Sequence, residues 1–313
     1  MSPRGTKSAE VEVAEDDDEA LAAAVRERLI TEARSSYAGP GVYDWPGEAY
    51  HADPVPGGSA RSTTLRTILR AGGPALVDHE ARYPRHSSAF DYGGAAHRYV
   101  LGKGDEVVEV PFDSWRTNDA KAMRREARAA GRRPLLAAEV VKARRLAEVV
   151  RSHPIAGPLF TACGTPERSV TWIDDETGET CRMMLDLFPH LDGPGVRVAG
   201  DLKTTTSVEL RDVVGTVVKY GYHQQVAFGL DGLATLGLVE VDFLLVFVTK
   251  EPPHLVRTVR IPPELLDVGR RRNRRALDRW SWCRDTGEWP PLPAAIDDLT
   301  PPAWALREDD EDR

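Results

Sequence analysis

The pattern of apolar and polar residues predicts a β-rich centre in the second half of the chain. Residues alternate along Glu167–Ile173, as is typical of a strand with one buried face. The polar segment Asp174–Glu179 predicts a hairpin turn, and Thr180–Phe188 and Val196–Lys203 follow it as strands. Val241–Val248 is almost continuously apolar, which indicates a central strand buried on both faces.

Helical patterns surround these strands. We expect helices at Asp16–Ser36, Ser62–Arg70, a short segment from Pro74, Ser87–Leu101, Trp115–Ala130, Leu135–His153, Val208–Val218, Tyr220–Leu236 and Pro262–Cys283. Ser62 or Thr63 and Ser207 are the expected N-caps, and Gly237 is the expected stop. The fold class is therefore α/β (α+β), with a mixed central β-sheet flanked by helices.

The remaining segments carry weaker signals. Glu106–Val110 and His254–Ile261 read as short strands, and the Pro- and Gly-rich stretch Gly39–Gly58 reads as a loop or an extended wrap. The domain boundaries predicted from these patterns are an N-terminal arm at 1–38, one domain at 39–292 and a Pro-rich acidic tail at 293–313.

Composition excludes several classes of protein. With 313 residues, 41% of them hydrophobic and 29% charged, the chain can bury a full-size core. It has no apolar run near the ~20 residues that span a bilayer and no apolar signal core at its start. Its 3 cysteines are widely spaced, which argues against a disulfide scaffold and against an all-cysteine iron–sulfur cluster. We expect a cytoplasmic protein without a membrane partner.

Charge is segregated along the chain. The net charge of −8 does not by itself favour a nucleic-acid partner, but acidic runs lie in the tails, at Glu15–Glu19 and Glu308–Asp312. Basic residues cluster at Lys121–Arg133 and Arg270–Arg279. Basic clusters around an acidic centre suit a polyanionic substrate, and solvated helix faces explain the same runs equally well.

The segment Val196–Thr206 carries the clearest chemical signal. Its strand ends in an acid–x–lysine pair, Asp201 and Lys203, whose side chains share one face because strand side chains alternate. The carboxylate can hold a hard divalent cation and the ammonium can steer or deprotonate a water beside it. A surface ion pair is the alternative for such a pair in isolation.

A second acid belongs to the same face. If the turn between the two strands centres near Asp192–Gly193, Asp186 lies opposite about residue 199 and one strand step from Asp201. Glu167 begins the neighbouring strand. A shared cation would offset the mutual repulsion of acids set in apolar strands. Alternatively, Asp186 pairs with a base such as Arg182.

Polar residues on two helices complete the set. His97 follows a run of small residues that allows close backbone approach, although a satisfied core histidine is the alternative reading. Tyr222 and Gln225 are three apart and share a helix face, and Lys219 lies one turn earlier. The three could bind a phosphate backbone, or they could form the polar stripe of an amphipathic helix.

In chain order these residues resemble the PD-(D/E)xK nuclease superfamily. They are most similar to its exonuclease VIII-like branch of phage-type recombination exonucleases. The resemblance spans residues 40–292 and is carried by Y-H-A-D-P with S-T-T-L-R-T-I-L and G-G-P-A-L, Y-G-G-A-A-H, C-R-M-M-L-D, D-L-K-T-T, G-Y-H-Q-Q-V-A-F-G-L-D-G-L and W-C-R-D-T-G-E-W-P.

The resemblance implies a restriction-endonuclease-like core and cleavage of DNA phosphodiesters that depends on Mg²⁺ or Mn²⁺. It assigns His97, Asp186 and Asp201 as metal ligands and places Glu167 in or beside the metal shell. Lys203 would position or deprotonate the attacking water. Lys219, Tyr222 and Gln225 would contact the DNA. Implied partners are double-stranded DNA ends, a single-strand annealing protein and further copies of the chain in a homo-oligomer.

Two positions depart from the family pattern. Asp201 stands where the superfamily often has glutamate, and Gly229 stands where relatives often have tyrosine. The leading hypothesis is an exonuclease that degrades one strand from a double-strand end, 5′ to 3′, to expose single-stranded DNA for recombination. The alternatives are an endonuclease or flap-trimming nuclease with the same centre, and a DNA-binding module without activity.

Overall fold

A mixed β-sheet forms the centre of the molecule. The computed structural model describes residues 24–25, 27–83, 88–191 and 196–301. Seven strands form the main sheet in the order β1-β5-β6-β7-β8-β9, with β2 paired to β6. The pairs β2–β6 and β7–β8 are parallel and the others antiparallel. The strands are β1 (Gly41–Tyr43), β2 (Ala60–Arg61), β5 (Gly164–Ile173), β6 (Thr180–Pro189), β7 (Arg197–Thr205), β8 (Val241–Thr249) and β9 (Val256–Arg260). The predicted fold class is confirmed.

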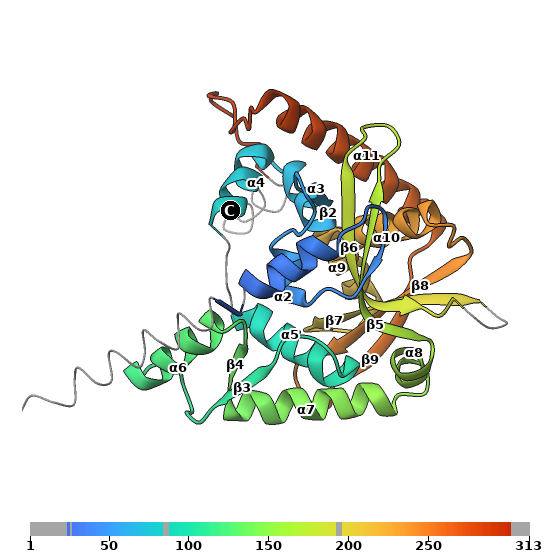
Figure 1. The fold of residues 1–313 in the computed structure, drawn as a ribbon. Coiled ribbons are helices and arrows are strands. Elements are labelled where there is room, and N and C mark those ends of the chain that lie inside the picture. The colour runs from blue at the N-terminus through green and yellow to red at the C-terminus, as the bar shows by residue number, and fades with distance from the viewer. Residues whose placement is uncertain (1–23, 26, 84–87, 192–195, 302–313) are drawn as a thin grey trace, which may run out of the picture.

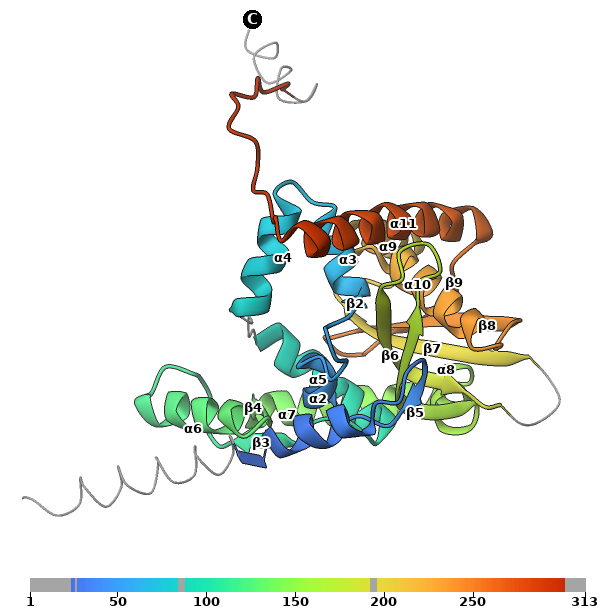
Figure 2. The same cartoon turned by 45° about the horizontal axis from the view of Figure 1, so that its top comes forward.

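Helices cover both faces of this sheet. In Figures 1 and 2, α11 runs along one side of the molecule with α3 and α4 beside it, and α7 runs along the other side with α5 and α6. The helices are α2 (Gly47–His51), α3 (Ser62–Ile68), α4 (Gly73–Arg82), α5 (Ser88–Leu101), α6 (Asn118–Ala129), α7 (Ala137–Ser152), α8 (Ala156–Ala162), α9 (Leu210–Tyr220), α10 (Tyr222–Thr235) and α11 (Pro263–Thr286).

Two hydrophobic clusters lie on opposite faces of the sheet. Strand β8 contributes to both, because Leu245 and Phe247 pack toward α3, α10 and α11, whereas Val246 and Val248 pack toward α5, α7 and α8. All four side chains are fully buried. Burial of each contributes roughly 1.5–3 kcal/mol. The continuous apolar run of this strand is thus explained by two covered faces.

Several local elements differ from the sequence prediction. The segment predicted as a loop at Gly39–Gly58 contains β1 and α2. The strand expected at Glu106–Val110 is present as β3 (Val107–Val110), but its parallel partner β4 (Arg133–Leu136) was not predicted. Strand β2 continues directly into α3. The N-cap of α3 is therefore the extended Arg61 rather than Ser62 or Thr63. Ser207 does not cap α9 either, because its Oγ accepts a bond from the Glu209 amide ahead of the helix.

The register of β6 and β7 corrects the predicted turn. Leu187 pairs with Gly200, so Asp186 stands level with Asp201 instead of residue 199. The shift is two residues and preserves parity, which brings the two acids opposite one another. The turn expected at Asp192–Gly193 lies outside the described residues, as do residues 1–23 and the acidic runs at Glu15–Glu19 and Glu308–Asp312.

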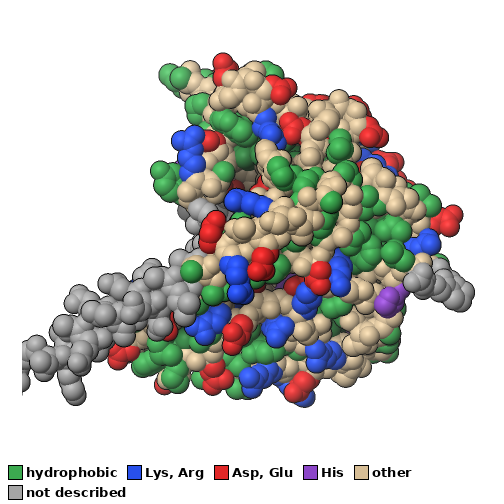
Figure 3. Space-filling model, viewed as in Figure 1, with side chains coloured by type: hydrophobic (Ala, Val, Ile, Leu, Met, Phe, Trp, Pro, Cys, Tyr) green, Lys and Arg blue, Asp and Glu red, His purple; other side chains and the backbone are tan. Residues whose placement is uncertain are grey.

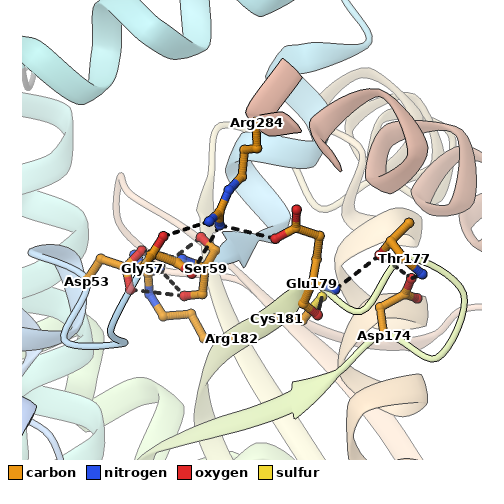
Figure 4. Close-up of polar contacts among 10 residues, drawn as sticks. Asp53, Gly57, Ser59, Asp174, Thr177, Glu179, Cys181, Arg182 and Arg284 are labelled. Atoms are coloured by element: carbon orange, nitrogen blue, oxygen red, sulfur yellow. Dashed lines mark hydrogen bonds and ion pairs between the residues drawn. The ribbon is translucent and has the colours of Figure 1, made fainter. Parts of the chain in front are cut away.

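A polar network ties the N-terminal loop to the sheet and to α11. Arg182 of β6 is buried, forms an ion pair with Asp53 at 2.5 Å and donates to the Ser59 carbonyl at 3.1 Å. Arg284 of α11 donates to the Gly57 carbonyl at 2.8 Å and pairs with Glu179 at 3.1 Å. Figure 4 shows these contacts converging on the loop. They hold the loop that precedes β2 and α3 against α11 and against β6, the strand that carries Asp186.

The described part of the N-terminal segment is helical, as the sequence predicted. Residues 27–36 are helical, and this helix ends at Ser36 as expected. Among the described residues, no helix combines the length and apolar character that crossing a bilayer would need.

Candidate active site

The candidate site lies where β6 and β7 separate. Leu187 and Gly200 form the single backbone pair between these two strands. Asp186 precedes Leu187 on β6 and Asp201 follows Gly200 on β7, so the two acids lie side by side next to this pair. Beyond it the Leu202 amide donates to Asp186 Oδ2 at 2.8 Å, so the carboxylate satisfies a donor that strand pairing leaves free. Leu185 and Leu187 pack into different hydrophobic clusters, so the regular alternation of side chains along β6 is interrupted at Asp186.

Asp201 is the more deeply buried acid. Its side chain is 4% exposed, forms an ion pair with Lys203 through Oδ2 and accepts a bond from Gln225 Nε2 through Oδ1 at 2.6 Å. Burial and the nearby charge of Asp186 raise the pKa of Asp201. The predicted sharing of one face by Asp201 and Lys203 is present, and α10 supplies the amide that orients the carboxylate.

Asp186 is held by His97. Nε2 of His97 lies 2.9 Å from Asp186 Oδ2, and its Nδ1 lies 2.7 Å from the Gly93 carbonyl oxygen. Both ring nitrogens therefore face acceptors, an arrangement that requires the doubly protonated imidazolium. Burial opposes that charge, but the Asp186 carboxylate outweighs it and raises the pKa of His97 to about 9. The charges of His97 and Lys203 in turn outweigh burial and lower the pKa of Asp186.

Glu167 stands on β5 beside this pair. The strands β5 and β6 pair on both sides of it, but Glu167 and Asp186 interrupt the ladder, and Glu167 adopts a left-handed φ of 48°. Such a conformation costs of order 1–3 kcal/mol in a non-glycine residue, so the surrounding structure must hold Glu167 in place. Burial, followed by the Asp186 charge, raises the pKa of Glu167. Lys103 holds the strained backbone by donating to its carbonyl at 3.1 Å.

Lys203 lies between Asp201 and an aromatic ring. Its Nζ is 4.8 Å from the ring centroid of Tyr222, a cation–π contact. Burial opposes the ammonium charge, but the Asp201 carboxylate outweighs burial and raises the pKa of Lys203. The lysine therefore carries a positive charge in this arrangement. Burial also raises the pKa of Tyr222, which keeps its hydroxyl protonated.

The two helices predicted around Lys219, Tyr222 and Gln225 are present, but the junction between them lies at Gly221. Helix α9 ends at Tyr220 and α10 begins at Tyr222, with Gly221 between them at a left-handed φ of 67°. Lys219 is thus on a different helix, and its Nζ lies 5.4 Å from the ring centroid of Tyr220. Tyr222 and Gln225 point to Lys203 and Asp201, so the structure brings these two into the acidic site and leaves Lys219 outside it.

The acids suit a divalent cation by donor type and charge. Asp186, Asp201 and Glu167 supply carboxylate oxygens, the ligands that Mg²⁺ and Mn²⁺ prefer. After burial, the charge of Asp186 raises the pKa of both Glu167 and Asp201, so the three acids act on one another at short range. Among the described residues, no three acids, histidines or cysteines are already arranged as a ligand cluster. The carboxylates of Asp186 and Asp201 are engaged by His97, Lys203 and Gln225. The residue types therefore fit the metal, and these contacts compete with it.

Sequence reasoning did not single out Arg66. This residue of α3 is close enough to Tyr222 and Asp201 for their charges to act on its guanidinium, although burial is the largest influence and lowers its pKa. Its segment, S-T-T-L-R-T-I-L, carried part of the family resemblance, but no spacing rule links residue 66 to a strand more than a hundred residues later.

Comparisons with known proteins identify the family and the fold. No curated protein matches the sequence. Among solved structures, a protein described as a candidate exonuclease, from Eubacterium rectale, is similar to this chain with a TM-score of 0.57 and 14% identity, over 85% of this chain and 98% of that one. At that identity the likeness shows the fold alone. The model of a PDDEXK-like domain of unknown function matches residues 63–297. The chain therefore belongs to this family of PDDEXK-like domains, which confirms the PD-(D/E)xK superfamily expected from its motifs.

Proposed function

We propose that the protein is a Mg²⁺- or Mn²⁺-dependent deoxyribonuclease that hydrolyses phosphodiester bonds from the ends of duplex DNA. The observation that carries the proposal is the convergence of Asp186, Asp201 and Lys203 where β6 and β7 separate, with Glu167 beside them. The family and the fold neighbour named above support a nuclease. End dependence, 5′-to-3′ polarity and a role in recombination rest on the resemblance to exonuclease VIII-like proteins.

Each residue has a role that follows from its contacts. Asp186, Asp201 and Glu167 would hold the cation, with His97 as a further ligand or, as it lies here, as the group that orients Asp186. A bound cation would supply activation of water and stabilisation of charge on the phosphate. Lys203 is charged, so it would position the water and stabilise the developing negative charge rather than act as a base. Gln225 would orient Asp201.

The test is degradation of linear against covalently closed duplex DNA in Mg²⁺, Mn²⁺ or EDTA. We expect loss of linear DNA only, abolished by EDTA, by Lys203→Ala and by the isosteric Asp186→Asn. Lys121→Ala is the matched control, because Lys121 is exposed on α6 and lies outside the site. Thermal melting of each variant establishes that it is folded.

Each other outcome has a defined meaning. Nicking of the closed circle would replace the exonuclease with an endonuclease. No loss of either DNA by the folded wild-type protein would refute nuclease activity. Duplexes labelled at one 5′ or one 3′ end report polarity, because release of the 5′ label first is expected.

A further inference from the structure

A basic cavity lies behind the candidate active site. It has a volume of about 310 Å³ and opens where α3, the junction of α9 and α10, and α11 meet. Five cationic side chains line it: Arg66, Arg70, Lys219, Arg272 and Arg275. No Asp or Glu is among its described lining residues.

The cations that line the cavity are gathered without an acidic partner in the described ranges. On α11, Arg270, Arg274 and Arg284 each form an ion pair with an acid. Arg271 and Arg279 form none among the described residues, but they do not line the cavity. Within the described part of the chain, none of the five cations that line the cavity has such a partner. The surface in Figure 3 shows the ordinary arrangement, in which Lys and Arg are interspersed with Asp and Glu over the lower part of the face. Positive side chains gathered without acids repel one another, and an anion bound among them would offset that repulsion.

The cavity is built into the fold. Arg66 donates to the Tyr220 carbonyl, and burial followed by surrounding charge, including that of Arg70, lowers the pKa of Arg66. A Cβ added at Gly221 would lie 2.7 Å from Cδ of Arg66. The glycine therefore serves both the left-handed turn between the helices and the passage of the arginine into the cavity.

One short segment links the cavity to the acidic site. Gln224 lines the cavity and bonds to Asn273 of α11, while the next residue, Gln225, bonds to Asp201. The rings of Tyr220 and Tyr222 stack with centroids 5.9 Å apart, so aromatic surface continues from the cavity to Lys203. A nucleic-acid strand in the site would therefore meet the cavity next.

We propose that the cavity binds a backbone phosphate of the DNA substrate other than the scissile one. The proposal rests on the proposed function. Guanidinium groups match phosphate oxygens in a planar, two-point contact, and such contacts set the register of a strand without reading its sequence. A strand anchored there would present its phosphates to Asp186 and Asp201 at a set position.

The test compares two double variants with the same charge change. Arg272→Gln/Arg275→Gln removes cations of the cavity, and Arg271→Gln/Arg279→Gln removes exposed cations of α11 that do not line it. Binding of a short fluorescent duplex is measured in EDTA, which prevents turnover, across a series of salt concentrations. We expect the cavity variant to reduce the slope of log K against log salt by about 1, the change expected for the loss of one phosphate contact, and the control to leave it unchanged.

The outcomes separate this proposal from the proposed function. A wild-type protein that neither binds nor cleaves DNA would refute the function itself. If the wild-type protein cleaves DNA and both double variants lose binding equally, the loss is a general charge effect, and the proposal that the cavity binds a phosphate is refuted. Binding of inorganic phosphate that depends on Arg272 and Arg275, with DNA binding unchanged, would assign the cavity to a free anion and also overturn it.

Discussion

The ion pair of Arg182 and Asp53 joins the N-terminal loop to the sheet, and its contribution to the free energy of unfolding can be measured. The Arg182 side chain is 3% exposed and lies 2.5 Å from Asp53, with further bonds to Ser59. Asp53→Ala would leave a buried guanidinium without its carboxylate and should cost about 3–5 kcal/mol of unfolding free energy. Arg182→Met should cost about 1–3 kcal/mol, because Asp53 is 25% exposed and retains the Ser59 amide donor at 2.7 Å.

The double variant distinguishes a coupled pair from two independent packing losses. Once Asp53→Ala has been made, Arg182→Met removes an unpaired charge, so the two costs should fall short of additivity by about 2 kcal/mol. Urea unfolding followed by circular dichroism gives the free energies by linear extrapolation. Additive costs would refute the reasoning that the buried charge dominates.

A surface pair at the same distance provides the control. Arg260 and Asp242 also lie 2.5 Å apart, but their side chains are 63% and 36% exposed. The corresponding cycle of Arg260→Met and Asp242→Ala should give a coupling of about 0.2–1 kcal/mol, since solvent screens the charges. Equal coupling in both cycles would show that burial does not set the strength of the pair.

Two further perturbations test packing and pH dependence. Gly232→Ala would place a Cβ 2.6 Å from the Trp172 ring, and this overpacking should outweigh the helix preference of alanine and lower the melting temperature. Gly215→Ala, in open space on α9, should raise the melting temperature, because only the helix preference acts there. Burial opposes ionisation of Asp174, but hydrogen bonds, including those from Arg274, lower its pKa. Stability from this pair should be fully present above the unfolded-state pKa of aspartate and disappear as pH falls through the lowered value. The difference in melting temperature between wild type and Asp174→Asn should narrow over that range, and a constant difference would contradict the assignment.

Much of the fold follows from local pattern. The apolar run of β8, the alternation in β5 and the acid–x–lysine spacing depend on the period of a strand, which short-range geometry dictates. For this reason Asp201 and Lys203 could be placed side by side from the sequence alone. The same locality explains the position of α10, where apolar spacing and Gly237 define the end of the helix.

The composition of the site was decided by tertiary structure. The register between β6 and β7 depends on long-range pairing, so it was two residues away from the position that turn placement indicated. The contact of Gln225 with Asp201, and the strained backbone of Glu167, arise only when three strands and α10 meet. The unpaired arginines of the cavity are brought together from distant segments by packing, because charge along a chain does not reveal which side chains find acids and which remain without them.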